Sequence, residues 1–246
     1  MTILTHRPLR DDHDLARMLA LITNAARREG VLAGHLSPGD VVWGLFQNLT
    51  IDPAARIRLF EDATGALRGF VWLYPPDAFE LHVDPACVDA AEVLREMARW
   101  AEVYLCTSAT PGALTLTIPE PDARLQSVAR SLGYRPTGGA EIQLNHRPLD
   151  GPLPALSPPD GAVVRPVRFD DPAEVAARVT LHREVWHPSR FTAEGYARLR
   201  TKPAYRPDLD LVLVTAAGEL ASYCIVWWGP AMRTAELEPV GTAACF

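Results

Sequence analysis

Residues 7–12 read RPLRDD, and residues 165–171 repeat this stretch almost letter for letter as RPVRFDD. In both places an apolar pattern at helical spacing follows at once, so the same local structure is expected twice. With 246 residues, the chain has room for two domains of ordinary size. The second copy reaches Phe246 at about the point where the first copy has reached Ala86, so we expect one whole unit and roughly half of another.

Composition narrows the class of protein. Hydrophobic residues make up 48% of the chain and charged residues 22%, which is typical of folded globular domains. The formal net charge of −6 has no basic block to offset it, and DNA or RNA binding needs clustered Lys and Arg, so no nucleic-acid partner is expected. Charges interrupt the first twenty residues, and no later run approaches the ~20 apolar residues that span a bilayer. We therefore expect a cytoplasmic protein with no membrane partner.

The sequence predicts no metal site. His182 and His187 are five residues apart, which places them on different faces of a helix. The cysteines lie far apart and lack C-x-x-C spacing, so neither a zinc site nor a disulfide framework is predicted. These cysteines are Cys87, Cys106, Cys224 and Cys245.

Apolar periodicity and turn residues predict the elements of the first unit. Asp11 or Asp12 caps a helix after the first strand, and Ser37 before Pro38 starts a second helix. Gly65 lies in a hairpin turn where glycine can take a positive φ. The predicted order is a strand at residues 3–9, helices starting near 12 and 38, strands at 56–60, 67–73 and 79–83, a helix at 90–105, a strand at 114–118, a helix at 122–132 and a strand at 141–145.

The second unit follows the same order after a Pro-rich linker. The predicted elements are a strand at 163–167, helices at 172–186 and 192–199, and strands at 209–215, 220–228 and 234–240. We therefore predict an α+β fold, an α/β/α sandwich in two tandem units with mixed, mostly antiparallel central sheets. The predicted parts are a domain at 1–150, a linker at 151–161 and the first half of a second domain, truncated after its fourth strand, at 162–246.

This order of elements resembles the GNAT superfamily of acyl-CoA-dependent N-acetyltransferases. The RPLRDD start, the hairpin around Gly65 and the stretch SLGYRP at residues 131–136 carry the resemblance, which covers nearly the whole chain. Two such units in one polypeptide are similar to the tandem members, of which mycothiol synthase is an example. The resemblance implies transfer of an acetyl group from acetyl-CoA to a primary amine of a small molecule or peptide.

The first unit departs from the family at its cofactor loop. In the family, acetyl-CoA lies between the fourth and fifth strands, with its pyrophosphate on backbone N–H groups of a glycine-bearing loop. The corresponding residues 84–90 read DPACVDA, which contain no glycine and place two aspartates beside a pyrophosphate. Ala129 stands where many members have a tyrosine general acid. We therefore expect the first unit to have lost cofactor binding.

The resemblance also points to candidate site residues. On the fourth strand of the second unit, Glu236 and Glu238 share one face by period 2 and are candidate bases for an ammonium substrate; Glu80 and His82 hold the aligned positions of the first unit. Such residues are also common on solvated strand faces and in cores, so both interpretations stay open. The candidate acetyl-CoA contacts are Val240, Gly241 and Thr242, and the candidate acceptor-site residues are Tyr223, Trp43 and Phe46.

Two functions remain open from the sequence. One is an acyltransferase whose second unit carries the chemistry, with the activity of this chain itself undecided, and the other is a non-catalytic binding or scaffolding module of the same fold. An unrelated α+β pair is a weaker alternative. A second sheet of four strands would leave one edge and one apolar face open, so we expect the first domain or a second copy in a homo-oligomer to cover that edge.

Overall fold

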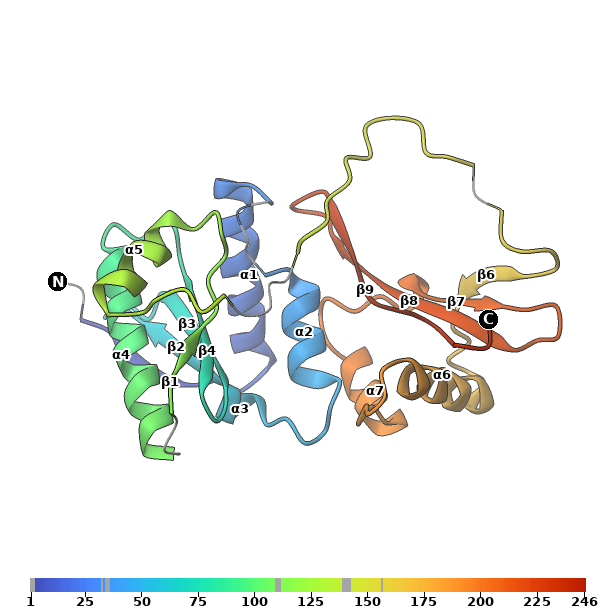
Figure 1. The fold of residues 1–246 in the computed structure, drawn as a ribbon, viewed down its shortest axis with the longest axis horizontal. Helices are drawn as coiled ribbons and strands as arrows, with labels where there is room; N and C mark the ends of the chain where they lie inside the picture. The colour runs from blue at the N-terminus through green and yellow to red at the C-terminus, as the bar shows by residue number, and fades with distance from the viewer. Residues whose placement is uncertain (1–2, 32, 34–35, 109–111, 139–142, 156) are drawn as a thin grey trace. The chain divides into compact units, whose positions relative to one another are not determined.

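The computed structural model describes residues 3–31, 33, 36–108, 112–138, 143–155 and 157–246. The chain forms two compact units (Figure 1). Unit 1 comprises Met1–Leu36 and Asp52–His146, and unit 2 comprises Ser37–Ile51 and Arg147–Phe246. Helix α2, Pro38–Phe46, thus packs with the C-terminal part of the chain, whereas the sequence analysis placed its residues in the domain at 1–150.

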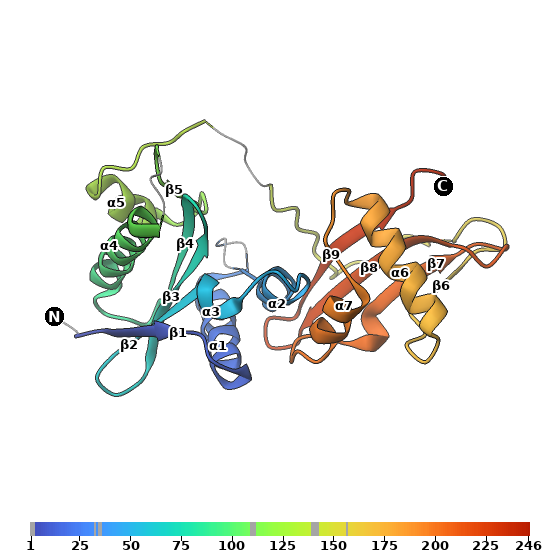
Figure 2. The same ribbon diagram turned by 90° about the horizontal axis from the view of Figure 1, so that it is seen from below.

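Unit 1 is a five-stranded sheet with helices on both faces. The sheet order is β1-β2-β3-β4-β5, antiparallel except for the parallel pair β4 and β5. Helix α1 lies on one face, and α4 and α5 cover the other (Figure 2). The elements are β1 Thr5–Pro8, α1 Asp12–Glu29, α3 Pro53–Arg56, β2 Ile57–Glu61, β3 Leu67–Tyr74, β4 Ala78–Val83, α4 Ala90–Ser108, β5 Thr115–Leu116 and α5 Ala123–Ser131.

Strands β4 and β5 meet over a short stretch only. Ala78 pairs with Thr115 and Phe79 with Leu116, and β4 then continues to Val83 without a β5 partner among the described residues. The predicted strand at 114–118 is therefore shorter than expected. The predicted strand at 141–145 falls partly outside the described residues, and 143–145, which are described, form no strand.

Unit 2 is a four-stranded antiparallel sheet in the order β6-β7-β8-β9. Helices α6 and α2 pack against β8 and β9 on one face of the sheet, and α7 packs against both helices. Along β8, buried positions therefore alternate with half-buried ones. The elements are β6 Val163–Pro166, α6 Pro172–Val185, α7 Ala193–Arg200, the short 3₁₀ helix Pro207–Leu209, β7 Asp210–Val214, β8 Leu220–Gly229 and β9 Thr234–Thr242. Together the two sheets confirm the predicted α+β fold class.

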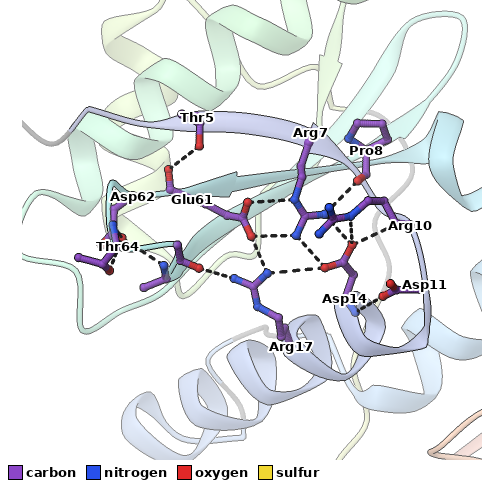
Figure 3. Close-up of polar contacts among 12 residues, drawn as sticks. Thr5, Arg7, Pro8, Arg10, Asp11, Asp14, Arg17, Glu61, Asp62 and Thr64 are labelled. Atoms are coloured by element: carbon purple, nitrogen blue, oxygen red, sulfur yellow. Dashed lines mark hydrogen bonds and ion pairs between the residues drawn. The ribbon is translucent and has the colours of Figure 1, made fainter.

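The repeated arginines tie the first strand of each unit to the helix that follows. In unit 1, Arg7 donates to both carboxylate oxygens of Asp14, at 2.6 and 2.7 Å, and also to Glu61 on β2 (Figure 3). In unit 2, Arg165 donates to both oxygens of Glu174 at the same distances. Each carboxylate sits in the first turn of its helix, where the helix dipole also favours negative charge. The sequence repeat thus corresponds to the same arginine–carboxylate ion pair between the first strand and the first helix of each repeat.

The hairpin turns of the two repeats match as well. Gly65 has a φ of 79° and Gly218 a φ of 84°, and each lies between the second and third strands of its unit. A left-handed backbone at these positions favours glycine, as the sequence predicted. No helix among the described residues is long and apolar enough to cross a membrane.

Candidate functional site

Three carboxyl groups of unit 2 converge where α2 begins and β9 passes. Asp40 on α2 and Glu236 and Glu238 on β9 each place a carboxylate oxygen within 4.8 Å of the others. The two glutamates lie on one face of β9, as their period-2 spacing indicated. Asp40 joins them from a helix that lies far away in the sequence. We call these three residues the acidic cluster.

The first turn of α2 holds this cluster in place. Ser37 and Asp40 form a capping box: Oγ of Ser37 accepts the N–H of Asp40 at 3.1 Å, and Oδ2 of Asp40 accepts the N–H of Ser37 at 2.7 Å. The Ser37 hydroxyl also donates a short hydrogen bond to Oε2 of Glu236. The Ser37 hydroxyl therefore accepts a free backbone N–H at the start of α2 and also orients the Glu236 carboxyl group, a candidate base.

Close packing fixes α2 against the sheet. A Cβ atom added to Gly39 would lie 2.5 Å from Cδ1 of Trp227 and 2.5 Å from Oε2 of Glu236, so only glycine allows this approach. Trp227 is buried and its Nε1 donates to the backbone carbonyl of Glu238 at 2.5 Å, whereas the neighbouring Trp228 is exposed on the other face.

The environment of the cluster raises the proton affinity of both glutamates. Burial raises the pKa of Glu236 to about 8, the negative charges of Asp40 and Glu238 add to the effect, and the hydrogen bond from Ser37 opposes it. Burial and the charge of Asp40 also raise the pKa of Glu238. A carboxyl group that titrates near neutral pH is suited to general base catalysis.

The acidic residues that gather in the described structure do not fit a metal ion. Carboxylates that hold Mg²⁺ or Ca²⁺ turn their oxygens to the ion. In the acidic cluster, Asp40 instead accepts the N–H of Ser37, and Glu236 accepts the Ser37 hydroxyl. In a second group of neighbouring residues, Asp11, His13 and Asp14, the Asp14 carboxylate pairs with Arg7.

The predicted acceptor-site residues of unit 2 lie in its packed interior. The side chain of Tyr223 is buried, its hydroxyl oxygen lies 2.7 Å from Nδ1 of His182, and the Arg178 guanidinium carbon lies 3.5 Å from its ring centroid. The ring of Trp43 packs edge-on against His182, and Phe46 is buried as well. Trp43 and Phe46 help to anchor α2 within unit 2 through contacts with His182, Phe191 and Arg198.

The predicted acetyl-CoA contacts lie on β9. Val240 is half exposed, and Oγ1 of Thr242 lies 2.8 Å from Oγ of Ser222 on β8. A side chain at Gly241 would meet Val185 of α6. Among the described residues, β9 has a strand partner on one side only. Its other edge leaves backbone N–H and C=O groups for a further partner.

In unit 1 the candidate residues Glu80 and His82 lie on β4. Nε2 of His82 is 3.4 Å from Oε2 of Glu80, and the His82 ring stacks on Phe70 with centroids 4.6 Å apart. The two candidates therefore contact each other, as their positions on one strand face suggested.

The turn between β4 and α4 bonds several of its own amides. Oδ1 of Asp84 accepts the N–H of Ala86 at 2.9 Å, and the carbonyl of Asp84 accepts the N–H of Cys87 at 2.9 Å. Sγ of Cys87 donates to Oδ1 of Asp89 at 3.1 Å. The chain's own carboxylates thus occupy the space beside these amides, which makes the turn a poor host for a pyrophosphate.

The sequence analysis missed Ser37 and Asp40 as site residues. It read Ser37 only as the start of a helix, and Asp40, three residues later, completes the capping-box pattern. That pattern was visible in the sequence, but nothing local connects it to β9.

No family model and no curated protein matches this sequence. Among solved structures, the chain is similar to a GCN5-related N-acetyltransferase from Sphaerobacter thermophilus, with a TM-score of 0.55 and 15% identity over 99% of this chain and 77% of that chain. This likeness shows that the chain has the fold of the GCN5-related N-acetyltransferases.

Two further structures show weaker likeness. A glucosamine N-acetyltransferase region of a fungal multi-domain β-N-acetylglucosaminidase has a TM-score of 0.46 and 13% identity over 100% of this chain and 32% of that chain. An N-myristoyltransferase from Saccharomyces cerevisiae with bound myristoyl-CoA has a TM-score of 0.48 and 12% identity over 98% of this chain and 63% of that chain.

Proposed function

We propose that this chain is an acyl-CoA-dependent N-acyltransferase, which transfers an acetyl group from acetyl-CoA to a primary amine of a small molecule or peptide. The observation that carries the proposal is the position of Glu236: it lies on the fourth strand of the second repeat, in a chain of this fold, and its pKa is raised to about 8. A base with such a pKa is partly ionised near physiological pH and holds an accepted proton firmly.

The proposed reaction begins with an ammonium group beside the acidic cluster. The carboxylate of Glu236 takes one proton, directly or through a water molecule, and the neutral amine attacks the thioester carbonyl carbon. The attacking nitrogen, which is positively charged in the tetrahedral intermediate, loses a second proton to solvent. The intermediate then expels the coenzyme A thiolate, so that a C–N bond replaces the C–S bond. The thiolate takes a proton from solvent, and Glu236 returns its proton to solvent. The charges of Asp40 and Glu238 favour a cationic acceptor over a neutral or anionic one.

The two units fit acetyl-CoA unequally. In unit 1 the amides of Ala86, Cys87 and Ala90 after β4 are already bonded to the chain's own oxygens, so we propose that the first domain has no acyl-CoA site and that Glu80 and His82 have no catalytic role. In unit 2 the free edge of β9, near Val240 and Thr242, offers backbone groups to the amides of a pantetheine arm.

A second candidate function is a non-catalytic binding or scaffolding module. The turn after β4 in unit 1 favours this second function, because unit 1 keeps the fold while side chains of the turn itself bond to groups that could otherwise bind a phosphate.

Calorimetric titration of the full chain with acetyl-CoA, followed by a thiol-release assay with a panel of primary amines, separates the two functions. The acyltransferase proposal predicts micromolar binding and amine-dependent release of free coenzyme A. No heat of binding and no thiol release with any amine would favour the scaffold.

A further inference from the structure

Helix α2 brings two polar groups of the first sequence repeat to Glu236. The Ser37 hydroxyl accepts the N–H of Asp40 and donates to Oε2 of Glu236, so it links the end of the helix to the glutamate. The contact of Gly39 with Trp227 leaves no room for the helix to move closer or for a side chain to intervene.

Among the described residues, the charged groups that face Glu236 are both acidic. Asp40 faces it from α2, and Glu238 faces it from β9. Asp40 also forms a side-chain hydrogen bond with Glu236, and two carboxyl groups can bond to each other only when one of them holds a proton. The Ser37 hydroxyl has one proton to donate and gives it to Oε2, which restricts the orientation of the Glu236 carboxyl group.

We propose that Asp40 and Glu236 share one proton in the resting protein, with Ser37 fixing the Glu236 carboxyl group, so that residues of α2 determine when Glu236 accepts a proton from a substrate. The shared proton is a property of the resting chain. The effect of α2 on proton transfer from a substrate rests on the acyltransferase function proposed above. In that reaction Asp40 and Ser37 are positioning residues, because they act through Glu236.

The two positioning residues have opposite effects on Glu236. The charge of Asp40 raises the pKa of Glu236, and the hydrogen bond from Ser37 lowers it. Removing the charge and removing the hydroxyl must therefore move the titration of Glu236 in opposite directions. General damage to the site would instead return the titration toward that of a solvated glutamate in both variants.

The test is a ¹³C NMR titration of the full chain carrying glutamate labelled at its side-chain carboxyl carbon. The Glu236 signal is assigned as the one missing from E236Q. In Asp40→Asn the amide oxygen still accepts the N–H of Ser37, so the capping box is retained while the charge is lost. We expect the titration midpoint of Glu236 to fall by about one pH unit in this variant.

Ser37→Ala provides an independent second variant. It removes the hydroxyl that donates to Glu236, so we expect the midpoint to rise, and Ser37→Thr, which keeps a hydroxyl, restores the wild-type midpoint. Asp171→Asn is the matched control, because Asp171 caps α6 in the same unit and has no contact with the acidic cluster among the described residues. It leaves the midpoint unchanged.

An unchanged midpoint in Asp40→Asn, or shifts in the same direction in Asp40→Asn and Ser37→Ala, would overturn the inference. The proposed function fails separately. If Glu236 titrates as expected but no amine is acylated, the proposal of a shared proton is supported and the proposed acyltransferase function is rejected. If amines are acylated with a pH profile that Asp40→Asn leaves unchanged, the proposed acyltransferase function is supported and the proposed role of α2 is rejected.

Discussion

The hydroxyl of Ser37 donates a hydrogen bond to Oε2 of Glu236, although the two residues belong to different repeats of the sequence. This bond places the start of α2 in the same compact unit as β9. The acidic cluster therefore depends on both repeats. A fragment that began after the linker would contain Glu236 and Glu238 but would lack Ser37 and Asp40.

Replacing Glu236 by Gln tests its role as the base. The variant keeps the size and hydrogen-bonding capacity of the side chain but cannot take a proton, so we expect acyl transfer to fall by about 100-fold or more. In the wild type, the carboxylate form of Glu236 increases as pH rises through about 8, so kcat/KM should rise with pH and level off above that value.

The measurement is the pH profile of kcat/KM for the wild type, E236Q and E219Q. Glu219 is exposed in the β7–β8 turn of the same unit, so E219Q should keep the wild-type profile. A variant E236Q with full activity and the same profile would contradict the assignment of the base.

Replacing Gly39 by Ala tests the contact between α2 and β9. Helix propensity alone favours Ala, but the added Cβ would lie 2.5 Å from both Trp227 and Glu236. We expect a loss of about 1–3 kcal/mol in the free energy of unfolding, measured by urea denaturation. Gly151, whose added Cβ meets nothing within 4 Å, supplies the control G151A. Equal stability of the two variants would contradict the prediction, because it would show that α2 can shift away from β8 and β9 at no cost in free energy.

Glu174 is predicted to stabilise unit 2 through its bonds to Arg165 and Arg168. These bonds hold its pKa at about 2, so its contribution to stability is present above the ordinary glutamate pKa of 4.5 and is lost as pH falls toward 2. E174Q leaves buried bonds unmade and should cost about 3 kcal/mol at pH 7. D14N should act in the same way on unit 1, where Asp14 pairs with Arg7. Denaturation at pH 7 and pH 3 checks both variants: the loss should be smaller at pH 3, and it should shrink less for D14N because the pKa of Asp14 lies below that of Glu174. A loss as large at pH 3 as at pH 7 in both variants would contradict this account.

His182 is predicted to make unit 2 sensitive to acid. Burial and the charge of Arg178 lower the pKa of His182 to about 4, so the folded state favours the neutral ring. The stability that this gives is complete above the ordinary pKa of 6.5 and falls by up to about 3 kcal/mol as pH drops to 4.

Glu236 acts with the opposite sign over much of the same range, so the measurement compares H182Q with the wild type at each pH. The difference in unfolding free energy should change between pH 7 and pH 4.5 for H182Q. It should stay constant for H187Q, because the side chain of His187 is exposed. Parallel pH curves for all three proteins would contradict the prediction.

The open apolar face of the second sheet, beside the edge that the acyltransferase proposal leaves to pantetheine, is predicted to be covered in a homo-oligomer. Leu237 is 62% exposed and Val240 is 50% exposed, both on β9, and large apolar side chains in such positions favour association. Sedimentation velocity over a range of concentrations should show self-association that L237K weakens. V88K is the control, because Val88 is fully exposed in unit 1. A monodisperse monomer at every concentration would contradict this expectation.

Local features of the fold were predicted correctly because their causes lie within a few residues. Asp11 caps α1 through a bond to the third residue that follows it, and the left-handed turn at Gly218 depends only on the residue type at that position. The strand at 114–118 was predicted too long because its apolar pattern does not show how far a partner strand stays within reach. Tyr223 was expected at a cleft, yet its hydroxyl satisfies the buried His182, a pairing that periodicity does not contain.

The helix cap at Asp11, the hairpin turns, most of the order of strands and helices, and the alternation that puts Glu236 and Glu238 on one face of β9 could be predicted from the sequence. All of these follow from backbone preferences and hydrogen bonds over short distances. The packing of α2 on unit 2, which brings Ser37 and Asp40 to Glu236, could be seen only in the folded chain. It depends on the apolar surface against which Trp43 and Phe46 are buried, and because the hydrophobic effect is non-directional, no local sequence pattern identifies that surface.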